Sequence, residues 1–173
     1  MEEVSHPRAR VFTAIKELCT GCGICQLVCS LSKTGRVNPH LARIGVAHSK
    51  GDLSYSPVIC RHCKNPPCKL ACPVPGAMTW GANGAVVIDE NSCIGCLACV
   101  EACPFAAIQL GPDREILKCD LCGGDPVCVR YCPPRVIYSP SQPPPWPQQS
   151  CLQYVEPHRV AVIRRPMNIS RKK

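Results

Sequence analysis

The cysteines of this chain are grouped by a spacing that is specific for one kind of chemistry. The stretch from Cys93 to Pro104 reads Cys-Ile-Gly-Cys-Leu-Ala-Cys-Val-Glu-Ala-Cys-Pro. Thiolates at the first three cysteine positions can surround a single 4Fe-4S cube, because the short loop between them curls around it. The fourth cysteine follows on a helical turn and reaches a different cube. One such motif therefore predicts a partner motif and at least two iron–sulfur clusters.

Three further cysteine groups repeat this spacing with small changes. The first motif, Cys19–Cys29, is regular but has Ser30 in place of the proline. The second, Cys60–Pro73, has two extra residues before its third cysteine, and the fourth, Cys119–Pro133, has three. Zinc sites and disulfides need neither a third cysteine at this spacing nor a proline after the fourth, so iron–sulfur ligation is favoured. Cys151 lies outside the four motifs and is interpreted as a spare thiol.

Two other side chains of the motifs carry individual predictions. His62 lies between two cysteines of the second motif, which already supplies four cysteines, so a surface histidine is expected. Ser30 replaces the proline that would end the helical turn and shield the cluster. The cluster held by Cys29 is therefore expected to be more accessible than the others or to have a different potential.

Composition favours a metal-stabilised protein in a reducing compartment. The 173 residues include 17 cysteines, while aromatic residues make up only 5%, so aromatic packing cannot be the main source of stability. The first residues are acidic where a signal peptide is basic, and no apolar segment of a signal peptide follows them. No apolar run approaches the length of a membrane span. We therefore expect a cytoplasmic protein that has no membrane span and binds metal instead of forming disulfides.

The net charge does not indicate nucleic-acid binding. It is +8 for the protein alone, but each oxidised cube with four thiolates carries about −2, so four clusters would bring the total near zero. Basic residues in or next to the motifs are expected to offset the cluster charge, with docking to an acidic partner as the alternative; they are Arg61, Lys64, Lys69 and Lys118. The sequence also has no interleaving of aromatic and basic residues of the RNA-binding type.

Short strands are expected around the motifs. The apolar stretches 10–15 and 43–47 flank the first motif, a β-hairpin over 77–88 connects the second motif to the third, and 107–110 is a further strand. The fold class is therefore α+β. Beyond the fourth motif, the proline-rich and basic segment 139–173 is expected to be an arm that extends from the folded part.

Connector length favours one pairing of the motifs. In a compact two-cluster domain the fourth cysteine of each motif ligates the partner's cluster, so the connector between the two motifs is short. Only one hairpin separates Cys72 from Cys93, whereas the connector from Cys29 to Cys60 is longer. This pairs the second motif with the third and leaves the first for the fourth. Sequential pairing, in which the first motif pairs with the second and the third with the fourth, would also join one regular and one widened motif in each domain. Connector length does not exclude it.

The four cysteine groups, with widened second and fourth members and a Cys-Arg-His-Cys-x4-Cys second motif, resemble the four-cluster iron–sulfur subunits of the dimethyl-sulfoxide-reductase and formate-dehydrogenase type. The resemblance covers Cys19–Pro133. It implies two bacterial-ferredoxin-like (β-loop-α-β) domains, one nested within the other. The outer domain would comprise residues 1–50 and 112–138, the inserted domain 51–111, and the arm 139–173.

The resemblance also implies nested pairing, in which three cysteines of one motif and the fourth of its partner hold each of four 4Fe-4S clusters. The implied ligand sets are Cys19, Cys22, Cys25 and Cys132 for cluster 1; Cys60, Cys63, Cys68 and Cys103 for cluster 2; Cys93, Cys96, Cys99 and Cys72 for cluster 3; and Cys119, Cys122, Cys128 and Cys29 for cluster 4.

The family's activity implies a non-catalytic electron-transfer subunit. It would relay single electrons between a large pterin–metal catalytic subunit and a second redox partner, either a flavin-containing subunit or a ferredoxin. The short chain resembles the small iron–sulfur subunit of tungsten or molybdenum aldehyde oxidoreductases. No phosphate loop, flavin or pterin signature, or nucleophile with a positioned base is present, so we expect no catalytic residues in this chain.

Several alternatives remain at this point. One is a free-standing polyferredoxin, and another is the electron-transfer subunit of a hydrogenase or formate dehydrogenase complex. A zinc-stabilised interaction protein is the most remote of them. Stacking of one chain on another through their exposed cluster ends is a further arrangement that the sequence leaves open.

Overall fold

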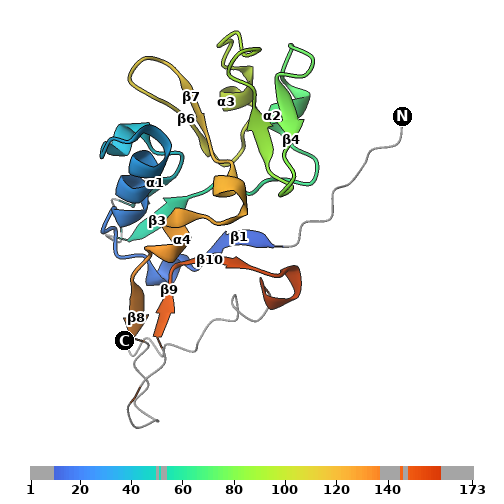
Figure 1. Ribbon diagram of the computed structural model, residues 1–173. Coiled ribbons are helices and arrows are strands. Elements are labelled where there is room, and N and C mark those ends of the chain that lie inside the picture. The colour runs from blue at the N-terminus through green and yellow to red at the C-terminus, as the bar shows by residue number, and fades with distance from the viewer. Residues whose placement is uncertain (1–9, 50, 52–53, 137–144, 146–147, 161–173) are drawn as a thin grey trace.

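Short helices and antiparallel strand pairs alternate along the chain (Figure 1). The structure is a computed structural model, and it describes residues 10–49, 51, 54–136, 145 and 148–160. The helices within these residues are α1 (Ile24–Thr34), α2 (Pro67–Leu70), α3 (Ala98–Glu101) and α4 (Val127–Arg130), with 3-10 turns at Lys16–Leu18, Pro39–Leu41, Leu121–Gly124 and Pro157–Arg159.

The strands of the described residues form two-stranded antiparallel sheets, which together with the helices make the fold α+β, as predicted. The pairs are β1 (Val11–Ala14) with β10 (Leu152–Val155), β2 (Gly45–His48) with β3 (Tyr55–Val58), β4 (Met78–Trp80) with β5 (Val86–Ile88), β6 (Ile108–Leu110) with β7 (Ile116–Lys118), and β8 (Pro134–Val136) with β9 (Gln148–Ser150).

The predicted strands are confirmed, although their partners were not predicted in every case. The hairpin expected over 77–88 is the pair β4–β5, in which Met78 lies opposite Ile88. The strand expected over 10–15 is β1, and its partner is β10 near the other end of the described chain. The strand expected over 43–47 is β2, which pairs with β3.

The residue after the fourth cysteine decides how long each motif's helix is. In α1 this residue is Ser30, and the helix, 11 residues long in all, continues to Thr34; at Gly35 the backbone turns left-handed with φ of 69°. The buried Ser30 hydroxyl donates a hydrogen bond to the Leu27 carbonyl at 2.9 Å and accepts one from the Asn38 N–H at 3.1 Å. In the other three motifs a proline follows the fourth cysteine and the helix has only 4 residues, because proline lacks the N–H that would continue it.

The motif helices pack in pairs. Helix α1 of the first motif packs against α4 of the fourth, and α2 of the second packs against α3 of the third. Figure 1 shows α2, α3 and β4 together in the upper part of the molecule, with α4, β1 and β10 below them. Helices that lie far apart in the sequence are therefore neighbours in space.

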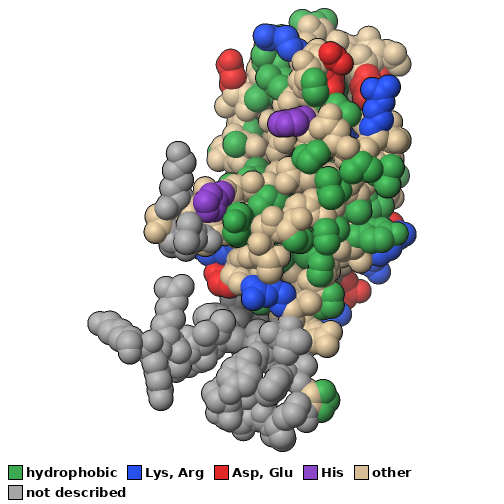
Figure 2. All heavy atoms as spheres, turned by 90° about the vertical axis from the view of Figure 1, so that its left-hand side faces the viewer, with side chains coloured by type: hydrophobic (Ala, Val, Ile, Leu, Met, Phe, Trp, Pro, Cys, Tyr) green, Lys and Arg blue, Asp and Glu red, His purple; other side chains and the backbone are tan. Residues whose placement is uncertain are grey.

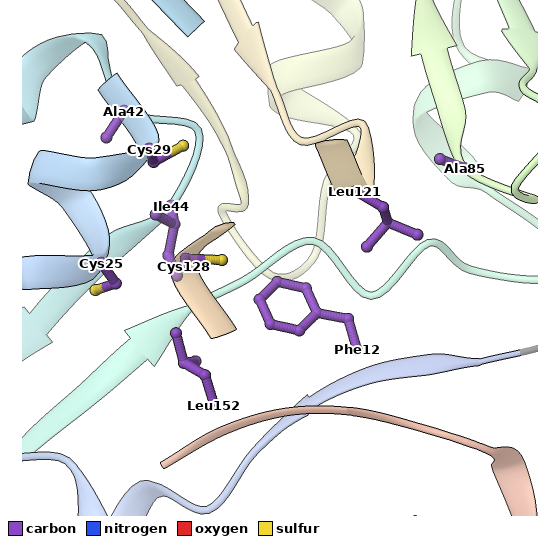
Figure 3. Packing of buried hydrophobic residues seen from close by; sticks show 9 residues of the cluster. All are labelled: Phe12, Cys25, Cys29, Ala42, Ile44, Ala85, Leu121, Cys128 and Leu152. Carbon is purple, nitrogen blue, oxygen red and sulfur yellow. The ribbon is translucent and has the colours of Figure 1, made fainter. Parts of the chain in front are cut away.

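Buried apolar side chains gather in two groups that follow the same division. The group around α1 and α4 (Figure 3) contains Phe12, Cys25, Cys29, Ala42, Ile44, Ala85, Leu121, Cys128 and Leu152. The group around α2 and α3 contains Cys68, Met78, Val86, Cys99 and Ile108.

Part of the segment expected to be an arm is folded. The prediction placed all of 139–173 in the arm, but residues 148–155 form β9 and β10. Leu152 is 1% exposed, and Tyr154, two residues further along β10, packs against the group around α1 and α4. One face of β10 is therefore buried. Strand β10 also satisfies the backbone groups of β1, which would otherwise lie at an open edge. The arm prediction for residues 139–144, 146–147 and 161–173 falls outside the described residues.

Candidate metal centres

Three cavities in the described structure are each lined by four motif cysteines. In each cavity, three cysteines come from one motif and the fourth comes from another. Cys93, Cys96, Cys99 and Cys72 line a cavity of about 310 Å³. Cys60, Cys63, Cys68 and Cys103 line one of about 350 Å³. Cys19, Cys22, Cys25 and Cys132 line one of about 380 Å³.

The other four motif cysteines, Cys29, Cys119, Cys122 and Cys128, also lie together. Burial is the largest cause that raises the pKa of Cys128, and the neighbouring thiols of Cys119, Cys29 and Cys122 raise this pKa further. Figure 3 shows the sulfur atoms of Cys29 and Cys128 pointing toward the same space, while the Cys25 sulfur points the other way. Helix α1 therefore directs its two cysteines, Cys25 and Cys29, to different groups.

The donors that line the cavities fit an iron–sulfur cube. Burial raises the pKa of both Cys25 and Cys119 to about 12, so these thiols stay protonated unless a positively charged core binds them. Sets of four soft thiolates are the donors that iron–sulfur clusters prefer.

Each motif has a left-handed residue directly before its second cysteine, where the loop must turn tightly. The two regular motifs have glycines at this position, Gly21 with φ of 71° and Gly95 with φ of 68°. The widened motifs have His62 with φ of 45° and Leu121 with φ of 59°, although such angles are unfavourable for residues with a side chain. Both of these side chains are buried, at 2% and 1% exposure.

The prediction of a surface histidine at position 62 is therefore wrong. The His62 side chain lines the same cavity as Cys60 and Cys63. The sequence shows that His62 occupies the position of a motif glycine, but it does not show that the turn points the ring inward.

Backbone N–H groups point at the sulfur of the fourth cysteine in three motifs. Such hydrogen bonds stabilise negative charge on the sulfur and help to set the potential of a bound cluster. The pairs are Arg43 to Cys29 at 3.3 Å, Ala107 to Cys103 at 3.4 Å and Leu152 to Cys132 at 3.4 Å.

Exposure of the cysteines differs along the molecule. Among the motif cysteines only Cys22 and Cys96 are exposed, and they belong to different cavities. The expectation that the group of Cys29 is the more accessible one is wrong, because Cys29 is 6% and Cys128 5% exposed. Ser30 itself is fully buried, and α1 continues past it to Thr34.

Cys151 lies beside a motif group, a position that the sequence analysis missed. It is 3% exposed and lines the cavity of Cys19, Cys25 and Cys132. Burial raises its pKa, and the neighbouring Cys19 raises it further. No spacing rule could have revealed this, because the pairing of β10 with β1 brings the residue there.

These features define an iron–sulfur protein of the ferredoxin type. A family model described as "4Fe-4S dicluster domain" matches residues 51–142, and the chain belongs to this family. A second model, "4Fe-4S binding domain", matches residues 16–35 around the first motif. The sixteen cysteines of the four motifs are consistent with four 4Fe-4S clusters.

Three curated relatives are named as parts of oxidoreductases. The polyferredoxin-like subunit of an aliphatic sulfonate oxidoreductase from Pyrococcus furiosus is 38% identical over 115 residues, which cover 66% of each chain. Subunit beta of an NADH-dependent phenylglyoxylate dehydrogenase from Aromatoleum evansii is 35% identical over 118 residues, which cover 66% of this chain but only 26% of that protein. One component of the anaerobic dimethyl sulfoxide reductase from Escherichia coli is 36% identical over 138 residues, which cover 69% of this chain and 67% of that component.

A solved structure, the active-site complex BamBC of benzoyl coenzyme A reductase, aligns with 89% of this chain and 85% of its own. Its TM-score is 0.43 at 19% identity. Within the part of the chain that the structure describes, no helix has the length and apolar character needed to cross a membrane.

Proposed function

We propose that the chain is an electron-transfer subunit that relays single electrons through four 4Fe-4S clusters within a larger oxidoreductase. The observation that carries this proposal is the arrangement of four cysteine groups with exposed cysteines only at Cys22 and Cys96. A bound cube supplies one-electron chemistry. The protein supplies the thiolates, excludes water from the inner groups and leaves one sulfur accessible in each of two groups.

We propose nested pairing for the ligands and domains. Cluster 1 is held by Cys19, Cys22, Cys25 and Cys132; cluster 2 by Cys60, Cys63, Cys68 and Cys103; cluster 3 by Cys93, Cys96, Cys99 and Cys72; and cluster 4 by Cys119, Cys122, Cys128 and Cys29. The cavity linings and the packing of α1 on α4 and α2 on α3 support this assignment. The outer domain then comprises 1–50 and 112–138, and the inserted domain comprises 51–111.

The closeness of thiols in different groups supports a linear order of clusters 1, 4, 2 and 3. Burial is the largest cause that raises the pKa of Cys128, Cys119 and Cys99, but a thiol of the next group also raises each pKa. Cys25 of cluster 1 raises the pKa of Cys128 in cluster 4, Cys60 of cluster 2 raises that of Cys119 in cluster 4, and Cys68 of cluster 2 raises that of Cys99 in cluster 3. The exposed Cys22 and Cys96 then belong to the two terminal clusters.

The proposed partners are a large pterin–metal catalytic subunit of the aldehyde-oxidising kind and a second redox protein, either a flavin-containing subunit or a ferredoxin. The relatives named as parts of oxidoreductases support a subunit role. Ile94 is 68% exposed beside Cys96, and an apolar rim of this kind can exclude water at a protein contact. Figure 2 shows further hydrophobic side chains gathered on one face of the molecule. The proposed location is the cytoplasm, since all cysteines are free thiols.

Anaerobic purification of the tagged chain from its native host tests the subunit role. We expect about sixteen irons per chain, together with a co-purifying large subunit that contains tungsten or molybdenum. A chain that carries all its iron but has no large partner is a free-standing carrier and contradicts the subunit role. A colourless chain that contains zinc contradicts electron transfer altogether.

Replacing Cys103 with serine tests the nested pairing. Nested pairing predicts that Cys103→Ser and Cys60→Ser alter the same cluster signal in electron paramagnetic resonance, because both residues hold cluster 2. Sequential pairing predicts instead that Cys103→Ser alters the signal that Cys119→Ser alters. Cys132→Ser is the matched control, since it also replaces a fourth cysteine but is expected to affect the cluster of Cys19.

A further inference from the structure

Lys118 is a buried lysine between two cysteine groups. It is the last residue of β7, directly precedes Cys119, and is only 5% exposed. Its Nζ lies 3.6 Å from the Cys60 sulfur and 3.4 Å from the Cys119 carbonyl oxygen, and it also donates a hydrogen bond to the Val86 carbonyl. The ammonium group therefore contacts the ligand Cys60 of one group and the backbone of the ligand Cys119 of the next.

The burial of this charge requires an explanation. Lysine is almost never fully buried unless its charge is paired, because removing an ammonium group from water is costly. In the described structure, the hydrogen bonds of Lys118 go to two neutral carbonyls and one sulfur. The negative charge available to balance it is therefore that of the cysteine ligands. Burial raises the pKa of the nearby Cys68 thiol, and the charge of Lys118 opposes this effect.

We propose that Lys118 raises the reduction potential of the cluster held by Cys60 and, to a smaller extent, that of the cluster held by Cys119. It does so by donating a hydrogen bond to the Cys60 sulfur and by placing a fixed positive charge between the two ligand sets. This inference rests on the ligand sets of the proposed function. Lys118 acts through the ligands and is a positioning residue.

The physical basis is the charge that reduction adds. A reduced cluster carries one more negative charge, so a cation and a hydrogen bond at its sulfur stabilise the reduced form more than the oxidised form. Water and salt screen a buried charge only weakly. The Cys60 group receives both the hydrogen bond and the charge, whereas the Cys119 group receives mainly the charge, and this difference sets the expected order of the two effects.

The location gives this charge a specific role. Clusters 4 and 2 are neighbours in the proposed order, and an electron that moves between them passes from the outer domain to the inserted one. Each cluster is negatively charged, so an added electron is repelled by the neighbouring cluster. A fixed cation between the two ligand sets weakens this repulsion at the one step that crosses between the domains.

Redox titration of the Lys118→Met variant tests the proposal. The full-length, iron-loaded protein is titrated without oxygen and its clusters are followed by electron paramagnetic resonance. The signals are assigned with Cys60→Ser and Cys119→Ser. At the wild-type midpoint of the Cys60 cluster, we expect the reduced-to-oxidised ratio to fall about tenfold, or about 59 mV for a one-electron couple. The Cys119 cluster should shift less in the same direction, and the terminal clusters should not shift.

Lys64→Met is the matched control, because it removes the same charge from an exposed position directly after Cys63. We expect its effect on the Cys60 cluster to be much smaller, since solvent screens the charge. Equal shifts in the two variants would overturn the proposal. Unchanged potentials in a Lys118→Met protein that retains all its iron would overturn it as well.

A third variant covers the case in which Lys118→Met loses iron. Lys118→Gln keeps an N–H donor but removes the charge, and the proposal predicts a downward shift here too, while unchanged potentials in Lys118→Gln overturn it. The failure of the proposed function would look different. In that case the wild-type protein itself would lack four one-electron clusters, whereas failure of this inference leaves four clusters whose potentials do not depend on Lys118.

Discussion

Replacing Asp120 tests how the fourth motif is held against α1. The Asp120 carboxylate accepts hydrogen bonds from Lys33 Nζ at 2.7 Å and from the Cys122 N–H at 3.1 Å. The Arg43 guanidinium lies 3.7 Å from the same carboxylate, whose side chain is 29% exposed. Asp120 thus joins a loop between two proposed ligands of cluster 4 to the helix that carries a third ligand, Cys29.

The size of the effect follows from these contacts. A capping hydrogen bond of this kind contributes about 1 kcal/mol. The partly exposed ion pair with Lys33 adds about 1 kcal/mol at most, and the longer contact to Arg43 adds less. Asp120→Ala should therefore cost about 2 kcal/mol, whereas Asp120→Asn keeps an acceptor for the Cys122 N–H and should cost about 1 kcal/mol.

The rate of cluster release in guanidinium chloride is a suitable assay, because a protein with bound clusters does not unfold in two states. The visible absorbance of the clusters reports the release. We expect Asp120→Ala to release them up to about thirtyfold faster than wild type and Asp120→Asn about fivefold faster. Lys33→Met should come close to Asp120→Asn, because both variants remove the ion pair between Lys33 and Asp120 and the longer contact to Arg43 adds little. Rates for Asp120→Ala within a factor of two of wild type would refute this account.

The pH dependence of this difference has a defined sign. Burial by itself raises the pKa of Asp120, but the hydrogen bonds from Lys33 and the Cys122 N–H, with the charges of Lys33 and Arg43, hold it below its ordinary value. A carboxylate of this kind stabilises the folded state fully above its unfolded pKa of about 3.9 and loses that effect as the pH falls through its folded pKa. The ratio of the Asp120→Asn rate to the wild-type rate should therefore stay constant between about pH 8 and pH 5. A ratio that changes within that range would contradict the assignment.

Three further substitutions use the same assay or an iron analysis. Cys151→Ala should retain the wild-type iron content, since four other cysteines line that cavity; the loss of one cluster would show that Cys151 is a ligand. Ser30→Pro should cost about 3 kcal/mol or more because it interrupts α1, and an unchanged release rate would show that the helix end is unimportant. Gly21→Ala would place a Cβ 2.5 Å from the Tyr55 ring at φ of +71°. It should therefore cost more than Gly35→Ala, which has a φ of +69° and no atom within 4 Å; equal costs would show that the ring moves aside.

The local features of this protein are predictable from sequence because they depend on short spacings. The three cysteines of a loop meet at one cavity whenever they lie close along the chain, as Cys93, Cys96 and Cys99 do. The hairpin between the second and third motifs has its own turn, and it forms where expected. Spacing also predicts that the fourth cysteine of a motif joins the cysteine group of another motif. Connector length favours one partner motif over another but does not decide between them.

The features that sequence reasoning missed depend on contacts between distant segments. The burial of Cys151 follows from the pairing of Leu152 with Ala14, which no local pattern encodes. His62 was misassigned because its left-handed backbone turns the ring into the cavity. The prediction of an accessible Cys29 group failed because the absence of proline was interpreted as a loss of shielding. In the structure α1 continues past Ser30 to Thr34, and Cys29 and Cys128 are buried.

The pairing of β1 with β10 also affects the order in which the protein can fold during its synthesis. The second and third motifs are contiguous in sequence, and their helices α2 and α3 can meet as soon as Glu101 has left the ribosome. Helix α1 must wait for α4, and β1 must wait for Val155. Contacts with such a large sequence separation form slowly, because the intervening chain must first be ordered. Helices α2 and α3 can therefore pair while Phe12 still lacks its partner strand β10.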